Sequence, residues 1–150
     1  MKLVEKTDET LYEHSLEVDD PKAFSTKRLV DRMIKTMQKE FGIGLAAPQV
    51  GINLRVFVMY MDKKPIGCIN PKILETSYEI EDEYEGCLSF PELRIKVPRP
   101  KSVFVEFYSP KGVLTERKLD GIEARCFQHE YDHLDGITMM RRHEMELGKD

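Results

Sequence analysis

The chain has 150 residues, of which 41% are hydrophobic and 33% are charged, and its formal net charge is −4 at pH 7. This length suits one domain built on one hydrophobic core, and we expect residues 1–150 to form it. The composition excludes an intrinsically disordered chain. Because the basic residues are scattered, we expect no nucleic acid and no membrane surface as a partner.

The N-terminal segment and the cysteines indicate the compartment. Residues 1–20 carry charges throughout, unlike a signal peptide or a transit peptide. Cys68, Cys87 and Cys126 are an odd number of cysteines, which favours reduced thiols. We therefore expect a cytoplasmic protein with at least one thiolate available as a metal ligand.

The first third of the chain predicts an arm followed by a helix. Residues 1–20 show no sustained period and end in a turn, so we expect an extended arm. Ser25 or Thr26 can cap a helix whose apolar residues recur at helical spacing as far as Phe41, where Gly42 ends it. We expect this apolar face to pack on the core.

Residues 42–51 combine glycines with small side chains, which predicts the close approach of another backbone. A phosphate cradle is disfavoured because the lysine of a P-loop is missing. An edge that pairs with an extended peptide is favoured instead. Gln49, the one polar side chain of this run, either bonds the local backbone or points its amide at a substrate.

Strand patterns occupy the middle of the chain. β-Branched and aromatic residues predict strands at residues 54–60, 67–74, 93–97, 102–108 and 113–119. The acidic segment 79–85 predicts a solvated face, except at Glu85. Cys87 lies on a turn between a glycine and a proline, whereas Cys68 and Cys126 read as small core residues.

The segment QHEYDH lies on a predicted helix over residues 122–134. His129 and His133 stand at i and i+4 on one face, where two imidazoles can bind one cation. Glu130 lies about 100° around the helix, where it can take a proton from a metal-bound water. The alternative is an amphipathic helix with two half-buried histidines. Apolar residues on two sides predict a central helix, which favours the metal.

The third metal ligand separates the enzyme classes. In metalloproteases of this type the ligand often follows the second histidine, but here Met139 stands where a histidine would. Glu144 and Glu146 remain open as downstream ligands. A thiolate from Cys87 would complete three corners of a tetrahedron and leave the fourth for water.

Three segments, GIGLAAPQ at residues 42–49, EGCLS at residues 85–89 and QHEYDH at residues 128–133, together resemble the motifs of the peptide deformylase family in order and separation. The resemblance implies a metal-dependent hydrolase that removes the formyl group from N-formylmethionyl peptides and nascent chains. It also implies an α+β fold, with small antiparallel or mixed sheets around a central metal-binding helix.

The resemblance assigns roles to individual residues. It implies that Cys87, His129 and His133 bind one divalent metal and that Glu130 is the general base and acid. It implies further that Gln49 and the backbone N–H of Leu88 stabilise the oxyanion. Substrate-binding roles are implied for Ile43, Gly44, Glu85, Gly86, Arg99, Ile122, Arg125 and Cys126.

The resemblance suggests Fe²⁺ as the physiological metal, with Zn²⁺, Ni²⁺ or Co²⁺ as substitutes. The ligand types alone suit iron and zinc equally. Two alternatives stay open at this point, a metallopeptidase of the H-E-x-x-H type and an inactive peptide-binding module.

The C-terminal segment 141–150 has few apolar residues, so we expect it not to dock firmly and a chain ending at Arg141 to keep its metal and most of its activity. The resemblance implies weak or absent ribosome contact, because the chain stops 17 residues after His133. Such a short form is similar to phage-borne or minimal members, so the expected location is a bacterial cytoplasm or the cytoplasm of a phage's host.

Overall fold

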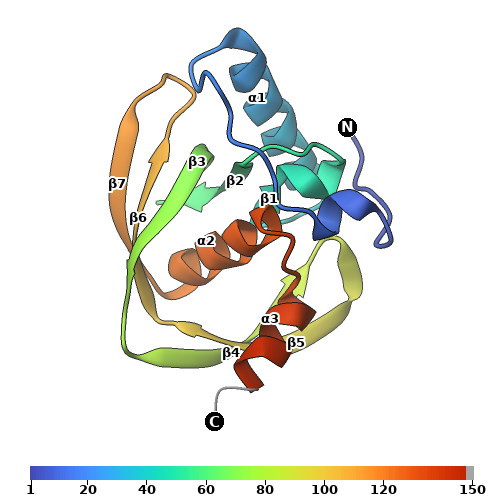
Figure 1. Cartoon of the computed structure of the whole chain (residues 1–150), viewed down its shortest axis with the longest axis vertical. Helices are drawn as coiled ribbons and strands as arrows, with labels where there is room; N and C mark the ends of the chain where they lie inside the picture. The colour runs from blue at the N-terminus through green and yellow to red at the C-terminus, as the bar shows by residue number, and fades with distance from the viewer. Residues whose placement is uncertain (148–150) are drawn as a thin grey trace.

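Two antiparallel sheets form the framework of the computed structural model, which describes residues 1–147 (Figure 1). The larger sheet has the order β1-β2-β3-β6-β7, with bounds Gly44–Ala46, Val56–Met61, Lys64–Thr76, Ser102–Tyr108 and Leu114–Asp120. The smaller sheet pairs β4, Ile80–Cys87, with β5, Phe90–Pro100. Together with the helices below, these sheets confirm the predicted α+β class.

Two strands are longer than predicted, β3 at Lys64–Thr76 instead of residues 67–74 and β5 at Phe90–Pro100 instead of residues 93–97. β3 continues through Asn70, which has a φ of 50° and lies at a register shift of the β3–β6 ladder. The interruption predicted at Asn70-Pro71 is therefore a bulge inside one strand. Residues 80–85 are exposed or half-exposed apart from Glu85, as predicted, although they form a paired strand.

Helix α2, Gly121–Leu134, passes through the middle of the molecule, as its two apolar stripes predict (Figure 1). Phe127 is fully buried and meets the ring of Phe57 on β2 edge-on, with 4.9 Å between centroids. His129 and His133 are 8% and 1% exposed. The core therefore surrounds two imidazoles, which is costly unless their nitrogens have partners.

Helix α1, Phe24–Lys39, packs Val30, Met33 and Met37 on the large sheet. The expected cap by Ser25 or Thr26 is wrong, because the helix begins at Phe24 and both residues lie inside its first turn.

The expectation that Phe41 packs on the core is also wrong. The helix ends before it, Phe41 has a φ of 57°, and its side chain is 94% exposed.

The N-terminal arm is extended only in part. It contains the 3₁₀ turn η1, Glu9–Tyr12, whose Leu11 is fully buried. The backbone N–H of Ser15 then donates to the Leu134 carbonyl at 2.8 Å. Gly136, just after the end of α2, has a φ of 72°. A β-carbon there would lie 2.6 Å from the Tyr12 carbonyl carbon, so the close contact between the arm and this turn requires glycine. A second 3₁₀ turn, η2, spans Ala47–Val50.

The C-terminal segment docks, which corrects our expectation for residues 141–147. Helix α3, Met139–Leu147, lies beside β5 (Figure 1). Its Arg142 guanidinium donates to both carboxylate oxygens of Asp132, at 2.8 and 3.1 Å, and Asp132 is 5% exposed. The error arose because apolar content was the criterion, whereas the anchor is an ion pair. Residues 148–150 lie outside the described part.

The substitution Arg142→Met tests this docking. Removing a two-point hydrogen bond to a buried carboxylate lowers the free energy of unfolding by roughly 1–3 kcal/mol. Chemical denaturation measures the change, and Arg141→Met is the matched control, because Arg141 pairs only at the surface with Glu144. Equal stability of Arg142→Met and Arg141→Met would contradict the anchoring role.

Candidate active site

Three ligand atoms converge where the end of β4 meets α2. The Sγ of Cys87 and one ring nitrogen each of His129 and His133 lie within 4.8 Å of one another, and all three residues are buried. The Cys87 Sγ to His133 Nε2 distance is 3.4 Å. A tetrahedral zinc-type site separates a sulfur and a nitrogen ligand by about 3.6 Å, so the donor set fits one cation closely.

Glu85 orients the first histidine. The Nδ1 of His129 lies 2.8 Å from Glu85 Oε1, which leaves Nε2 for the cation. Arg99 donates from Nη2 to the same oxygen at 2.9 Å. Burial raises the pKa of Glu85, but the hydrogen bonds from His129 and Arg99 outweigh it and lower that pKa from 4.5 to about 2. Glu85 therefore remains a carboxylate that fixes the His129 ring.

Glu130 has the environment of a proton carrier. It is 4% exposed, and its Oε1 has no hydrogen-bond partner among the described residues. Burial, with the charge of Glu85, raises the pKa of Glu130 from 4.5 to about 7 against the opposing charges of His129 and Arg99. A carboxyl group with this pKa can take up and release a proton near neutrality.

Gln49 both bonds the local backbone and directs its amide nitrogen toward the site, the two alternatives expected for it. Its Oε1 accepts from the backbone N–H of Ala46 at 2.9 Å, so half of the amide serves the local backbone. Its Nε2 points the other way, 3.0 Å from Ser89 Oγ and 3.6 Å from Cys87 Sγ. The donor half of the amide therefore faces the ligand cluster.

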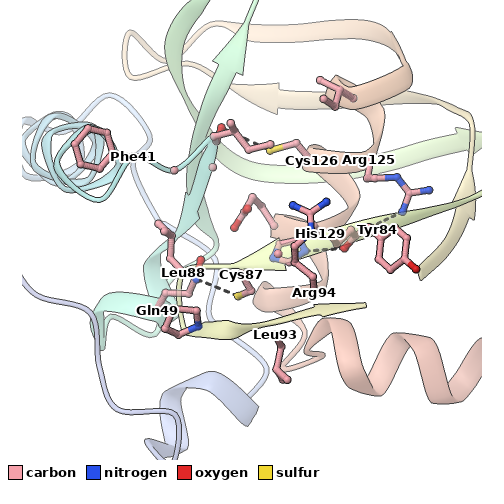
Figure 2. Close-up of a pocket in the computed structure, with 18 residues that line it drawn as sticks. Phe41, Gln49, Tyr84, Cys87, Leu88, Leu93, Arg94, Arg125, Cys126 and His129 are labelled. Atoms are coloured by element: carbon pink, nitrogen blue, oxygen red, sulfur yellow. Dashed lines mark hydrogen bonds and ion pairs between the residues drawn. The ribbon is translucent and has the colours of Figure 1, made fainter. Parts of the chain in front are cut away.

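A cavity of about 600 Å³ opens beside the cluster (Figure 2). Its walls include the residues that sequence reasoning assigned to the site at Ile43, Gly44, Gln49, Glu85, Gly86, Cys87, Leu88, Ile122, Arg125, Cys126, His129 and Glu130. β1 is the edge strand of the large sheet, and its Gly44 lies on the cavity wall. Among the described residues β1 has a strand neighbour on one side only, which is the form predicted for pairing with an extended peptide, although its three residues are buried.

The two arginines are placed differently. Arg125 donates to Glu85, to the Val97 carbonyl and to the Glu81 carbonyl, so its charge is held by the small sheet while the residue lines the cavity. Arg99 is 3% exposed, bonds Glu85 and Asp132, and does not line the cavity. This corrects the expectation that Arg99 holds the peptide, since it reaches the site only through Glu85.

Other residues of the cavity and its support were not predicted. Phe41, Gly42, Tyr84, Pro91, Leu93 and Arg94 also line it. Ser89 accepts a hydrogen bond from Gln49, and Asp132 accepts one from Arg99, so both help to hold site residues in place. Both lie within the recognised sequence motifs, yet neither was predicted to have a role. Because successive side chains of a strand point to opposite faces, the sequence could have predicted that Tyr84 and the buried Glu85 lie on different faces of their strand. For the other residues no local pattern predicted a place at the cavity.

The downstream glutamates are not ligands in the described structure. Glu144 pairs with Arg141 and Glu146 with Arg142, both at 3.6 Å on α3. Cys87 occupies the third place near the histidines instead. The arrangement that a metallopeptidase with a downstream ligand requires is therefore absent from residues 1–147.

The fold and the site define an α+β hydrolase with a Cys-His-His cluster that can hold a metal ion and an adjacent glutamate. The family "Polypeptide deformylase" matches residues 1–147. The chain belongs to this family, and as a member it is a metal-dependent enzyme that deformylates N-formylmethionyl peptides.

Individual relatives agree with this assignment. A peptide deformylase of Thermotoga neapolitana is 50% identical over 116 residues, 77% of this chain and 71% of the relative. The crystal structure of the Thermotoga maritima peptide deformylase has a TM-score of 0.91 and 41% identity, covering 94% of this chain and 95% of that one. An Acinetobacter baumannii class I type b peptide deformylase, solved with Met-Ala-Ser bound, has a TM-score of 0.89 and 32% identity, covering 95% and 97%.

The contact between Gly44 and Glu130 gives a steric prediction. A β-carbon at Gly44 would lie 2.7 Å from Glu130 Oε2 and 2.8 Å from Cys126 Sγ. Gly44→Ala therefore displaces the carboxylate and lowers kcat/KM for a formyl peptide about 100-fold. Gly86→Ala is the matched control for folding and metal content, because a β-carbon there meets nothing within 4 Å. Wild-type kcat/KM in Gly44→Ala would show that the position of Glu130 does not limit the reaction.

Proposed function

We propose that this chain hydrolyses the formyl amide of N-formylmethionyl peptides at the site of Cys87, His129 and His133, with Glu130 as the proton carrier. The observation that carries this proposal is the buried carboxyl group of Glu130, whose Oε1 has no partner among the described residues, beside a buried cluster of one thiol and two imidazoles. Such a cluster suits Fe²⁺ or Zn²⁺. When bound, the cation supplies Lewis acidity, which lowers the pKa of a water molecule toward neutrality and polarises a carbonyl group.

Glu130 acts first as the general base and then as the general acid of the hydrolysis. It takes a proton from the attacking water as that water adds to the formyl carbon, and it then delivers the proton to the amine as the C–N bond breaks. Formate and a peptide with a free amino terminus leave. Burial raises the pKa of Glu130, which favours a carboxyl group that can return the proton it has taken.

Neutral donors stabilise the developing oxyanion. The Nε2 of Gln49 and the backbone N–H of Leu88 are the candidate donors, each contributing about 3 kcal/mol to the transition state. The local contact of Gln49 Oε1 with Ala46 supports this role because it fixes which end of the amide faces the cluster. Ile43, Ile122, Cys126 and the stem of Arg125 supply an apolar wall for the methionine side chain.

One assay separates this proposal from its alternatives. Formate release is measured from formyl-Met-Ala-Ser, beside cleavage of the acetylated and the unblocked peptides. We expect formate from the formyl peptide alone. Cleavage of a peptide bond in the unblocked peptide would indicate a metallopeptidase, and binding without any hydrolysis would indicate an inactive module.

The substitution Glu130→Gln tests whether Glu130 is the general base or a metal ligand. Because Glu130 is not a member of the ligand cluster, this variant keeps a metal content near one per chain and loses nearly all turnover. Metal analysis and formate release are measured on the same preparation. Loss of the metal together with the activity would mean that Glu130 is itself a ligand.

The identity of the metal is tested by oxidation. We propose Fe²⁺ as the physiological metal, because the resemblance of the motifs suggests it and the donors accept it. Air or peroxide then inactivates the iron form much faster than the cobalt, nickel or zinc forms, through oxidation at iron and thiolate. Activity is followed over time for each form, and equal lifetimes would argue against iron bound by Cys87.

A cytoplasmic location and weak ribosome contact stay predictions. Within residues 1–147 no helix is long and apolar enough to span a membrane.

A further inference from the structure

Strand β7 has a strand neighbour on one side only. Its seven residues, Leu114–Asp120, pair with β6 without a register shift, and no strand within residues 1–147 pairs with its other side (Figure 1). The strand contains neither proline nor glycine. Monomeric proteins usually shorten, bulge or cover such an edge, because its free N–H and C=O groups can pair with another chain. β7 therefore offers a regular edge to another strand.

The hydrogen bonds at both ends of the β6–β7 pair show which residues face the free edge. The N–H of Ser109 donates to the Val113 carbonyl at 2.9 Å, and the N–H of Gly121 donates to the Lys101 carbonyl at 3.1 Å. Hydrogen-bonded pairs alternate with non-bonded pairs along an antiparallel ladder, so the odd-numbered residues of β7 bond β6. The even-numbered residues therefore direct their N–H and C=O groups outward. They are Leu114, Glu116, Lys118 and Asp120, and all four side chains are exposed.

Glu116 and Lys118 lack a favourable charge partner in their own fold. Glu116 lies opposite Glu106 on β6, and like charges in directly opposite positions destabilise a sheet. Lys118 lies opposite Phe104. Neither Glu116 nor Lys118 forms an ion pair within residues 1–147. A second strand of suitable charge beside β7 supplies both partners.

Only one register of two β7 strands brings these opposite charges together. Two copies related by a two-fold axis run antiparallel, and their outward-facing residues must lie opposite one another to exchange hydrogen bonds. The registers that keep most of the strand paired are centred on Glu116, Arg117 or Lys118. Centred on Glu116 or on Lys118, the pair places that residue against its own copy, which opposes like charges. Centred on Arg117, it places Glu116 opposite the partner's Lys118, and Lys118 opposite the partner's Glu116.

The remaining residues are compatible with the register centred on Arg117. Leu114 lies opposite the partner's Asp120 on the exposed face. Arg117 meets its own copy on the other face, but its guanidinium already donates to Asp62 Oδ2 at 3.0 Å, which offsets the repulsion. Leu119 is 2% exposed and stays in the core of its own protomer. The charged side chains that normally protect an edge strand are therefore complementary to a second copy of this strand.

We propose that two copies of this chain associate by antiparallel pairing of their β7 strands in the register centred on Arg117. Each pair of opposed outward-facing residues then exchanges two backbone hydrogen bonds, and the large sheets of the two copies join. One strand pair buries a total area below about 1,200 Å², the size of weak and reversible interfaces. We therefore expect a Kd on the order of 10 µM, which rises with salt concentration because the ion pairs are exposed. The inference is independent of the proposed function.

Sedimentation equilibrium of the full-length, metal-loaded protein measures the association. Glu116→Lys and Lys118→Glu each place like charges opposite one another in the dimer, and each weakens association at least about tenfold. An equal mixture of the two variants associates with close to the wild-type Kd, because each variant presents to the other the charge that its own copy lacks. Glu75→Lys is the matched control, since it makes the same change of charge at an exposed position of β3 and keeps the wild-type Kd.

Hydrogen exchange of individual backbone amides, followed by NMR, tests the strand pairing itself. The amides of Glu116 and Lys118 exchange freely in the dilute protein and become protected as its concentration rises, whereas those of Arg117 and Leu119 are protected at every concentration. A protein that stays monomeric at every concentration overturns the proposal. So does association that both single variants retain, because it would use another surface. Exchange at Glu116 and Lys118 that does not depend on concentration would also overturn it, because the copies would then associate without pairing these strands.

Discussion

A chain of charge-assisted hydrogen bonds from His129 through Glu85 and Arg99 to Asp132 and Arg142 is the constraint on which the rest of the structure depends. Its middle three members are between 3% and 6% exposed. Charges buried to this degree destabilise a fold unless each has a partner. Loss of one of these hydrogen bonds would therefore leave a buried charge unpaired and destabilise the fold. These hydrogen bonds join α2, β4, β5 and α3, so the orientation of His129 in the candidate metal cluster depends on correct assembly of elements from most of the protein.

The position of the chemistry follows from the same assembly. α2 carries the two histidines and the glutamate into the core, and the end of β4 brings the thiol to them. The edge strand β1 then lies beside Glu130 at a glycine, where a side chain would collide with the carboxylate. Burial does two things there, because it raises the pKa of Glu130 and strengthens every polar contact inside the cavity. The edge strand β1 therefore begins beside a buried carboxyl group whose pKa is raised.

The sequence predicted what depends on local spacing. The i, i+4 histidines, the central helix and the buried Glu85 were visible because periodicity and motifs report on neighbours along the chain. The role of Arg99 as a support of Glu85 was missed, since its partners are 14 and 33 positions away. The docking of α3 was missed because its anchor, Arg142, is charged. Phe41 was assigned to the core because its helical spacing is correct although the helix ends before it.

X-ray absorption at the metal edge of the iron-loaded or zinc-loaded protein tests the central claim most directly. The account predicts one sulfur ligand near 2.3 Å and two histidine nitrogens near 2.0–2.1 Å, with the sulfur lost in Cys87→Ser. A first coordination shell without sulfur in the wild type, or a sulfur that persists in Cys87→Ser, would contradict it.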